Sequence, residues 1–297
     1  MKPSEDYLQA CSGVIETVAA QQEAIETAAG WFADTIAAGR LVHLFGSGHS
    51  RMMVEEMWPR YGSFPGWNPI VELSLTFHNL TTGANGQRQA MFLENVSGLA
   101  DRILRNFDLS DQDAALVVSS SGTSIVPVEI AELFQQRGVK VVALVSRLHS
   151  EASTSKREDG RKLGDFADLV LDTGAPVGDA AVTIEGLDTP VAPLSTVGGV
   201  MLVNAIKAEV ADRLTRAGVP PKVLTAALAQ KPGELRAASL SIQMLVTTGP
   251  SRWSPVGREV VRISSCAPRP PSSHRSPEGL PLAGSAAQTS VQSKTTA

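Results

Sequence analysis

The hydrophobic residues along the chain follow two periods, and each period predicts a different kind of element. In four segments apolar side chains recur every three to four residues, as they do on the buried face of a helix. These predicted helices span residues 14–38, 89–107, 125–137 and 195–217. Short unbroken apolar runs, which are typical of strands buried on both faces, lie between them. The predicted strands are 41–45, 114–118, 139–145 and 168–171, with weaker candidates at 70–75 and 181–184.

The order of these elements predicts the class of fold. Buried strands alternate with helices over about residues 4–230, and this order is typical of a parallel sheet that is covered by helices on both faces. Residues 14–38 are expected to form an N-terminal helix that stops at Gly39, because glycine readily ends a helix. The sequence therefore predicts an α/β fold.

Residues 231–297 differ from the rest of the chain in composition. They hold eight of the 18 prolines and eight Lys or Arg against three Asp or Glu, whereas residues 1–230 hold 18 against 27. Such a composition cannot bury a core, so a disordered tail is expected. A basic arm for an anionic partner and an out-of-frame end of a GC-rich gene are alternatives. The predicted division is a helical segment 1–39, a domain 40–230 and the tail.

Length and charge narrow the possible functions. The chain has 297 residues and a formal net charge of −4, so it can bury a substantial core but has no overall basic charge for nucleic acid. No apolar run approaches the roughly 18–20 residues that span a membrane, and the polar start at residues 1–6 is unlike a secretory signal. With only Cys11 and Cys266, a disulfide framework is excluded. We expect a cytoplasmic protein that binds neither nucleic acid nor membrane.

Two turns that connect a strand to a helix carry the candidate chemistry. The first is residues 45–50 (FGSGHS) and the second is residues 118–124 (VSSSGTS). Small residues let the backbone approach a ligand closely, and free N–H groups at the start of a helix attract an anion. Clustered hydroxyls add donors for phosphate oxygens. Since ligands of parallel sheets bind at the carboxyl ends of the strands, the two turns predict one phosphate-bearing ligand between them.

The second turn is the more specific signal. Four serines and one threonine lie within residues 119–124, whereas the start of a helix needs only one hydroxyl as a cap. The first turn alone is a weak signal, because Arg51 stands where a dinucleotide-binding motif has its third glycine. The chain also has no Walker A sequence.

Together the two turns resemble the sugar isomerase (SIS) domain family. The pattern is Gly-x-Gly-x-Ser at 46–50 and Ser-x-Ser-Gly-x-Ser at 119–124, and the resemblance covers about residues 5–228. It is closest to stand-alone bacterial SIS proteins and more distant from phosphoheptose isomerase and N-acetylmuramic acid 6-phosphate etherase. It implies a flavodoxin-like three-layer α/β/α sandwich with a five-stranded parallel sheet, and a homodimer with its site near the interface. After about Ala229 the chain departs from the family, which ends in a helix there.

By this resemblance the serine-rich turn holds the phosphate of a sugar phosphate. The residues assigned to it are Ser119, Ser120, Ser121, Thr123 and Ser124. Ser47, in the first turn, would contact the sugar or the phosphate. No cofactor is implied, and no metal site is expected, because the five histidines have no metal-ligand spacing.

Chemistry on such a sugar starts with the removal of a proton by a carboxylate or an imidazole. The candidate catalytic residues are Glu55, Glu56, Glu94, His49 and His78, with His149 as a further imidazole. By the resemblance, Glu94 lies where etherase-like relatives keep a second catalytic glutamate, whereas Arg60 stands in place of the first. For Glu55 and Glu56 a solvated helix face is the competing interpretation.

Two functions from different classes follow. The first is an enzyme that acts on a 6-phosphorylated amino sugar, N-acetylated or not, by removing the C2 proton. Its outcome would be elimination or dehydration, as in a lyase, or aldose–ketose isomerisation. The second is a non-catalytic phosphosugar sensor, a role that SIS domains serve when they are joined to a DNA-binding module. The acid/base candidates around the turns favour the enzyme, and the choice stays open at the level of sequence.

Overall fold

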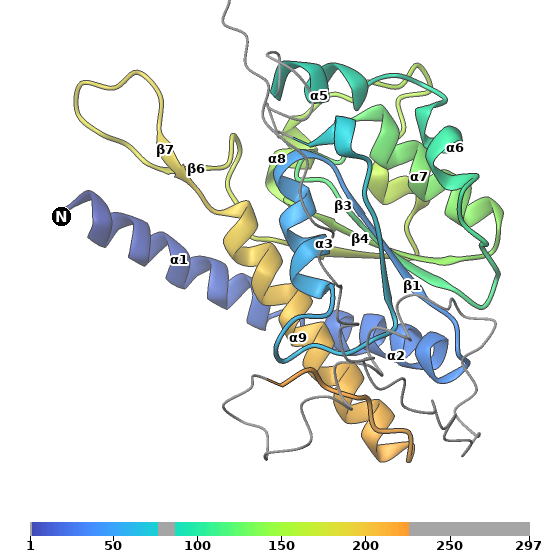
Figure 1. The fold of residues 1–297 in the computed structure, drawn as a ribbon. Helices are drawn as coiled ribbons and strands as arrows, with labels where there is room; N and C mark the ends of the chain where they lie inside the picture. Colours follow the sequence, from blue (N-terminus) through green and yellow to red (C-terminus); the bar gives the residue numbers. More distant parts are fainter. Residues whose placement is uncertain (1, 77–86, 226–297) are drawn as a thin grey trace, which may run out of the picture. The chain divides into compact units, whose positions relative to one another are not determined.

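One parallel sheet organises the part of the chain that the structure describes. The computed structural model describes residues 2–76 and 87–225. Five parallel strands pair in the order β2-β1-β3-β4-β5 (Figure 1). They are β1 (Val42–Gly46), β2 (Trp67–Ile70), β3 (Ala114–Val118), β4 (Lys140–Val145) and β5 (Leu169–Asp172). Because β1 and β3 are neighbours, the two predicted ligand turns leave adjacent strands at the same edge of the sheet.

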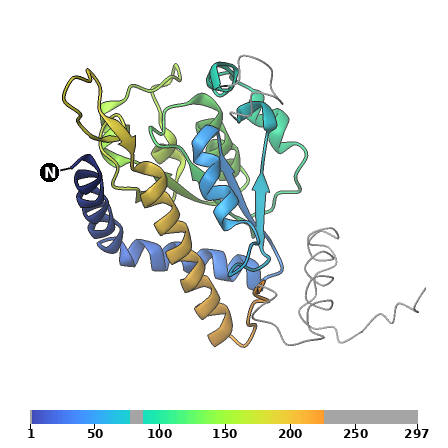
Figure 2. The same cartoon turned by 60° about the vertical axis from the view of Figure 1, so that its left-hand side comes forward.

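Helices cover both faces of the sheet, as the alternation of elements predicts. Successive side chains of β3 point to opposite faces, so Leu116 packs in one buried cluster and Val117 in another. The first cluster includes side chains of α2 (Gln22–Ala37), α3 (Arg51–Met57) and α9 (Ser195–Arg216), and the second includes those of α6 (Leu99–Leu104) and α7 (Ile125–Gln136). Figure 2 shows the long α9 crossing α2 on the first face. The predicted three-layer α/β/α sandwich is confirmed.

α1 (Pro3–Ala19) lies before α2 at the N-terminal end, and shorter elements connect the strands. These include η1 (Gly48–Ser50), η2 (Leu73–Leu75), α5 (Gln87–Leu93), α8 (Arg147–Ala152) and η3 (Leu163–Phe166). β6 (Ala180–Val182) and β7 (Val191–Pro193) pair antiparallel in a small separate sheet, so the strand predicted near 181–184 lies outside the parallel sheet. The other weak candidate, 70–75, begins at the last residue of β2 and continues into η2.

The N-terminal segment forms two helices, α1 and α2, rather than the single helix predicted over 14–38. At the break, the side chain of Gln21 bonds to the backbone of Asp172 in the edge strand β5. Its Nε2 donates to the carbonyl oxygen (2.8 Å), and its Oε1 accepts from the N–H (2.7 Å). An edge strand has unpaired backbone groups, and Gln21 satisfies two of them. The apolar period runs through the break, so it could not reveal this contact.

The segment 89–107, predicted as one helix, also forms two. α5 and α6 are separated at Gly98, whose φ of 82° lies outside the helical region. The carboxylate of Glu129 on α7 accepts a hydrogen bond from the Gly98 N–H (2.9 Å) and thereby holds the break in place. The helical period places Phe92 on the buried face, but this side chain is 70% exposed, because the break ends the face that the period assumes.

A buried ion cluster lies at the amino-terminal edge of the sheet, opposite the two turns. Asp113, just before β3, is 2% exposed and accepts two hydrogen bonds of 2.9 Å from the guanidinium of Arg40. Nε2 of the buried His43 lies 3.2 Å from the same carboxylate. Burial alone would raise the pKa of Asp113, but His43, Arg40 and the N–H of Ser110 outweigh it and hold this pKa far below its usual range. The cluster thus ties the start of β1 to the start of β3.

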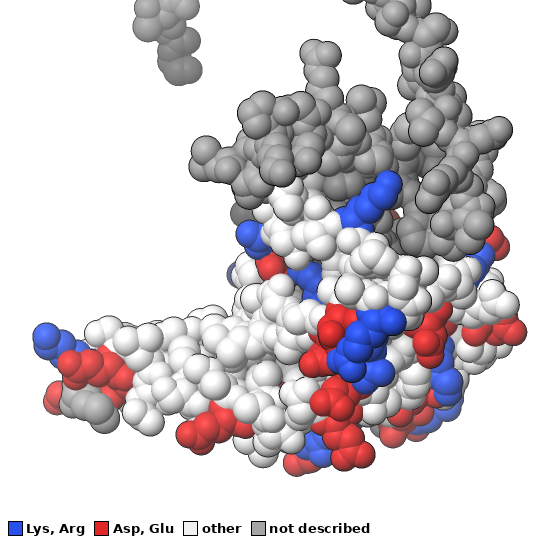
Figure 3. Space-filling model, turned by 90° about the horizontal axis from the view of Figure 1, so that it is seen from below, with Lys and Arg blue, Asp and Glu red and all other residues white. Residues whose placement is uncertain are grey.

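Charges of both signs share the described surface. On the face shown in Figure 3, basic and acidic side chains are interspersed rather than gathered by sign over the described residues. No helix within residues 2–76 and 87–225 is long and apolar enough to cross a membrane. The predicted tail 231–297 lies outside the described residues.

Candidate functional site

The turn after β1 folds back tightly and brings a hydroxyl to the carboxyl edge of the sheet. A Cβ on Gly46 would lie 2.6 Å from the carbonyl oxygen of Ser50, so only glycine allows this turn. Gly48 adopts a φ of 53°, which also favours glycine. Between them, the Ser47 hydroxyl donates a hydrogen bond of 2.8 Å to Oε2 of Glu94.

The serine-rich turn after β3 is a compact loop in which most hydroxyls have partners. Oγ of Ser119 accepts from a backbone N–H within the turn (3.2 Å), and the hydroxyls of Ser121 and Thr123 bond to each other (2.9 Å). Ser124 stands at the start of α7, but its side chain does not cap that helix and donates instead to Oε1 of Glu94 (3.1 Å). Helix capping therefore does not account for the hydroxyl of Ser124.

Glu94 connects the two turns. Each of its carboxylate oxygens accepts one hydrogen bond, from Ser47 and from Ser124. Its backbone carbonyl accepts a third, from the N–H of Val126 in the first turn of α7 (2.9 Å). Both the backbone and the side chain of Glu94 are thus anchored, and a half-buried carboxylate is held at a fixed position.

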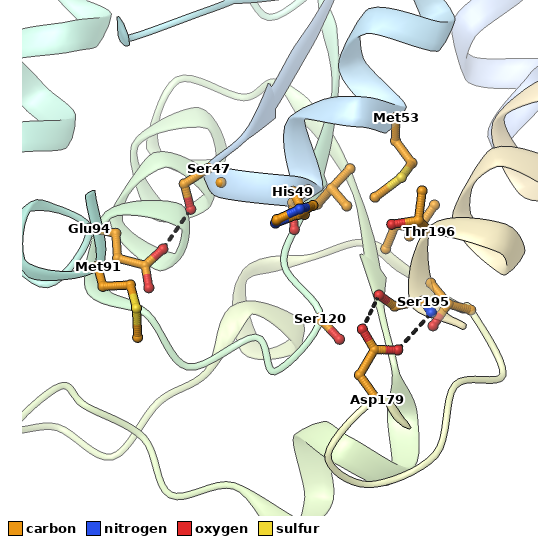
Figure 4. Close-up of a pocket in the computed structure, with 14 residues that line it drawn as sticks. Ser47, His49, Met53, Met91, Glu94, Ser120, Asp179, Ser195 and Thr196 are labelled. Carbon is orange, nitrogen blue, oxygen red and sulfur yellow. Dashed lines mark hydrogen bonds between the residues drawn. The ribbon is translucent and has the colours of Figure 1, made fainter. Parts of the chain in front are cut away.

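Ser47 and Glu94 border a cavity of about 270 Å³ at the carboxyl ends of β1, β3 and β4 (Figure 4). On the side of the first turn it is lined by residues 47–50, Met53, Met91 and Glu94. Ser120 also lines it, and its Oγ is buried without a hydrogen-bond partner among the described residues. Such an atom is rare in a folded protein, and a polar group of a ligand in the cavity could satisfy it.

The opposite wall comes from the segment after β5 and from the start of α9. Its lining residues are Thr173, Asp179, Ser195 and Thr196. The carboxylate of Asp179 accepts hydrogen bonds from the Ser195 N–H (2.7 Å) and the Ser195 hydroxyl (2.6 Å), and Figure 4 shows both. Our sequence analysis missed this wall. The Gly178-Asp179 pair is typical of a turn, but Asp179 lies 16 residues before Ser195, so this local signal does not connect the turn to the start of α9.

Comparison with known proteins places the chain in a family. The model of the SIS domain matches residues 6–146. A UPF0309 protein of Halalkalibacterium halodurans is 32% identical over 219 residues, which cover 73% of this chain and 88% of that protein. A UPF0309 protein of Brucella canis is 35% identical over 221 residues, which cover 74% and 86%. The chain belongs to the UPF0309 family of SIS domain proteins. The resemblance noted from the two turns is confirmed.

Solved structures similar to this SIS domain protein include a phosphoheptose isomerase from Neisseria gonorrhoeae. It is 14% identical and has a TM-score of 0.45, with 70% of this chain and 96% of that chain covered. The NanR protein of Vibrio vulnificus, in complex with ManNAc-6P, is 17% identical and has a TM-score of 0.36, with 71% and 64% covered.

Not all of the candidate catalytic residues meet at the cavity of the SIS domain. Glu94 and the exposed His49 line it, whereas Glu55 and Glu56 do not. Glu55 is exposed and paired with Arg51 one turn earlier on α3. His78 lies outside the described residues. The structure therefore brings together one candidate carboxylate, one candidate imidazole and the two turns.

Glu56 takes part in a cluster with Lys207 between α3 and α9. Lys207 is 5% exposed, and its Nζ donates to the carbonyl oxygen of Glu56 (2.7 Å) near the end of α3. Burial lowers the pKa of Lys207. Burial alone would raise the pKa of Glu56, but hydrogen bonds from Asn204 and Arg60 lower it overall. These contacts join α3, which carries Met53 of the cavity, to α9.

His149 also lies outside the lining of the cavity, but it contacts the loop that forms one wall. Its Nδ1 accepts a hydrogen bond of 2.9 Å from the N–H of Gly178, next to Asp179. Within residues 2–76 and 87–225, no group of three or more His, Cys, Asp or Glu is arranged to hold a metal ion.

Proposed function

We propose that this SIS domain protein binds a 6-phosphorylated amino sugar, N-acetylated or not, in the cavity and removes its C2 proton. The observation that carries the proposal is the carboxylate of Glu94, which is held between the two ligand turns at the edge of the cavity. Membership of the SIS family supports a phosphosugar as the ligand, because the family implies binding of phosphate by the serine-rich turn.

The phosphate is assigned to the turn at residues 119–124. α7 begins there, and the N–H groups at the start of a helix attract an anion. The unpartnered hydroxyl of Ser120 offers a donor within the cavity. Gly122, at a φ of 62°, keeps the turn compact. Ser119, Ser121, Thr123 and Ser124 shape the turn through the hydrogen bonds described above and remain part of the assigned phosphate site.

Glu94 is assigned as the base. The C2–H bond of the open-chain sugar breaks, the proton passes to Glu94, and the electron pair forms the enolate of the C1 carbonyl. In elimination, that pair forms the C2–C3 double bond while the C3 substituent leaves with its bonding electrons. In isomerisation, a proton is added at C1, while the heteroatom on C2 loses its proton and the oxygen on C1 gains one. His49, which lines the same cavity, is the candidate donor of the proton to the leaving oxygen.

The proposal also covers the cellular location, the partners and the oligomeric state of the protein. A sugar phosphate is an intracellular metabolite, so we place the protein in the cytoplasm, with no nucleic acid or membrane as partner. The family resemblance implies a homodimer, which light scattering during size-exclusion chromatography would test.

The test of the proposal is proton NMR in D2O with N-acetylglucosamine 6-phosphate, with glucosamine 6-phosphate and fructose 6-phosphate as parallel samples. With the two amino sugar phosphates, loss of the C2 proton signal with new olefinic signals identifies a lyase, and new ketose signals identify an isomerase. With fructose 6-phosphate, new aldose signals identify an isomerase. Line broadening of the sugar without turnover identifies the alternative function, a non-catalytic phosphosugar sensor. No change with any of the three sugars would contradict phosphosugar binding.

A further inference from the structure

The cavity has a second carboxylate, Asp179, that the proposed proton transfer does not use. Asp179 belongs to the loop between β5 and β6, whereas Glu94 follows α5. Figure 4 shows the two carboxylates on different sides of the cavity, with Glu94 beside Ser47 and Asp179 beside Ser195. Neither the sequence motifs nor the proposed proton transfer assigns a role to this carboxylate.

The backbone of Asp179 is in a conformation that few residues adopt. Its φ is 63°, and the preceding Gly178 has a φ of 80°. Left-handed backbone is uncommon outside glycine and persists where surrounding contacts fix it, often at ligand sites. Here the Asp179 N–H donates to the carbonyl of Pro176 (3.0 Å), and its own carbonyl accepts from the Leu194 N–H (3.2 Å). The loop therefore holds the side chain at one place against the start of α9.

A purely structural role for Asp179 would be to cap α9, but the cap does not use every acceptor position of its carboxylate. Oδ1 accepts from the N–H groups of Leu194 (3.1 Å) and Ser195 (2.7 Å), and Oδ2 accepts from the Ser195 hydroxyl (2.6 Å). An ionised carboxylate has about four acceptor positions, so these three hydrogen bonds leave one position on Oδ2. Because all three partners donate, Asp179 acts as an acceptor, and a further partner must also be a donor.

The hydrogen bonds of Asp179 also indicate a position in the cavity where the phosphate does not bind. α9 begins at the cavity, where Ser195 and Thr196 line it, and a helix start would attract an anion. There the carboxylate of Asp179 already accepts hydrogen bonds from the N–H groups of Leu194 and Ser195, so these donors are not left for a second anion. In the serine-rich turn, the hydroxyl of Ser120 has no partner among the described residues, and this residue lines the cavity. A phosphorylated ligand is thus oriented with its phosphate at the serine-rich turn and its uncharged end at Asp179.

We propose that Asp179, together with Thr196 on the same wall of the cavity, binds hydroxyl groups at the end of the sugar that is remote from the phosphate. Hydroxyl groups are donors, as the acceptor position on Oδ2 requires, and both residues line the cavity. The ligand class is accordingly a phosphorylated polyol or sugar rather than a phosphorylated ligand without hydroxyls. This inference rests on the proposed function, since it takes the phosphate to bind at the serine-rich turn.

The experiment is calorimetric titration of the full chain and of Asp179→Asn with two ligands, N-acetylglucosamine 6-phosphate and inorganic phosphate. Asparagine caps helices about as well as aspartate, so the start of α9 is kept, but its amide NH2 cannot accept from a sugar hydroxyl. We expect binding of the sugar phosphate to weaken by about tenfold or more, with binding of inorganic phosphate unchanged. Asp188→Asn, an exposed aspartate in the loop between β6 and β7, is the matched control and should change neither.

Each outcome separates this inference from the proposed function. If the unchanged chain binds neither ligand, the proposed function fails. If it binds both, and Asp179→Asn binds both equally well or weakens both by the same factor, Asp179 does not recognise the sugar and the inference is overturned while the phosphate site stands. If Asp179→Asn melts well below the unchanged chain, Thr196→Val is used in its place, because it replaces a hydroxyl on the same wall by a methyl group. We again expect weaker binding of the sugar phosphate and unchanged binding of inorganic phosphate. Equal effects on the two ligands would again overturn the inference.

Discussion

The hydroxyl of Ser47 donates a hydrogen bond of 2.8 Å to the carboxylate of Glu94, although the two residues are 47 positions apart in the sequence. Ser124, from the other ligand turn, bonds to the second oxygen of the same carboxylate. The two turns that were singled out as phosphate sites therefore also position an acidic side chain. A base that is held by donors on two sides needs little rearrangement when the substrate arrives.

Glu94→Gln tests this assignment. Glutamine has the size of glutamate but cannot take up a proton from carbon, so we expect turnover to fall by about a hundredfold or more while affinity for the sugar phosphate stays within a few-fold. Turnover is measured by NMR and affinity by calorimetry. Glu55→Gln and Glu56→Gln serve as comparisons, because both side chains lie outside the cavity. Normal turnover by Glu94→Gln, or a large loss in either comparison, would show that the base has been assigned wrongly.

The sequence predicted the sheet more accurately than the turns between helices. Residues 114–118 form β3 with the predicted bounds, because an apolar run that is buried on both faces needs no distant partner to be recognised. The break at Gln21 depends on the backbone of Asp172, and no local pattern contains that contact. Likewise, Glu94 was predicted as a candidate, but its two serine donors come from turns that only the fold brings together.

The wall around Asp179 marks the limit of prediction for the site. One part of this wall follows β5 and the other part begins α9, so β6, β7 and the loop between them separate the two parts in the sequence. A cap on α9 was not predicted at Asp179, because caps are ordinarily sought immediately before the helix. Left-handed backbone at an aspartate is decided by the loop as a whole, which the residue types alone do not specify.

Gly198→Ala is expected to disturb this wall from the side of α9. A Cβ at this position would lie 1.9 Å from the carbonyl oxygen of Thr173, which is backbone and cannot rotate away. We expect the free energy of unfolding to fall by about 3 kcal/mol, and sugar phosphate binding to weaken, because Thr173 lines the cavity. Urea unfolding followed by circular dichroism measures the first effect.

Gly13→Ala is the matched control for this substitution. Gly13 lies inside α1, and a Cβ there would meet nothing within 4 Å. Alanine favours a helix over glycine by about 0.5–1 kcal/mol, so this variant should be slightly more stable than the unchanged chain. Equal effects at the two positions would mean that the close approach of α9 to Thr173 has no energetic consequence.

Asp113→Asn should remove a pH-dependent part of the stability. The folded-state pKa of Asp113 lies below its ordinary value of 3.8, so its contribution is fully present above that value and is lost as the pH falls from there toward the folded-state pKa. Asparagine leaves the half-buried Arg40 and the buried His43 without their carboxylate, and we expect a loss of about 3 kcal/mol at neutral pH. The difference from the unchanged chain should stay constant between about pH 7 and about pH 5 and should narrow between about pH 5 and about pH 3.

Urea unfolding at several pH values measures this difference. The exposed neighbour Asp111, changed to Asn, is the control and should shift the free energy of unfolding by no more than about 0.5 kcal/mol. A difference between Asp113→Asn and the unchanged chain that stays constant over the whole range would show that the carboxylate does not titrate below its ordinary pKa in the folded state.

His149 is predicted to act on the site through the loop that carries Asp179. Its Nδ1 accepts from the Gly178 N–H (2.9 Å), and its backbone N–H donates to Oγ of Ser146 (3.2 Å), whose hydroxyl donates to the carbonyl of Ala175 (2.7 Å). Both ends of the loop are thus tied to the start of α8. Removal of the acceptor in His149→Ala leaves Gly178 to water and loosens Asp179. We expect KM to rise about three- to tenfold with little change in kcat.

His149→Asn distinguishes this positioning role from loss of packing. The side-chain oxygen of asparagine can take the place of Nδ1 as acceptor for the Gly178 N–H, so it should restore KM toward that of the unchanged chain, while the imidazole is absent from both variants. Steady-state kinetics on the two variants, with melting temperatures to confirm folding, make the comparison. If the Asn variant is as impaired as the Ala variant, the hydrogen bond to Gly178 is not what connects His149 to the cavity. A fall in kcat with an unchanged KM would instead indicate a direct part in the chemistry.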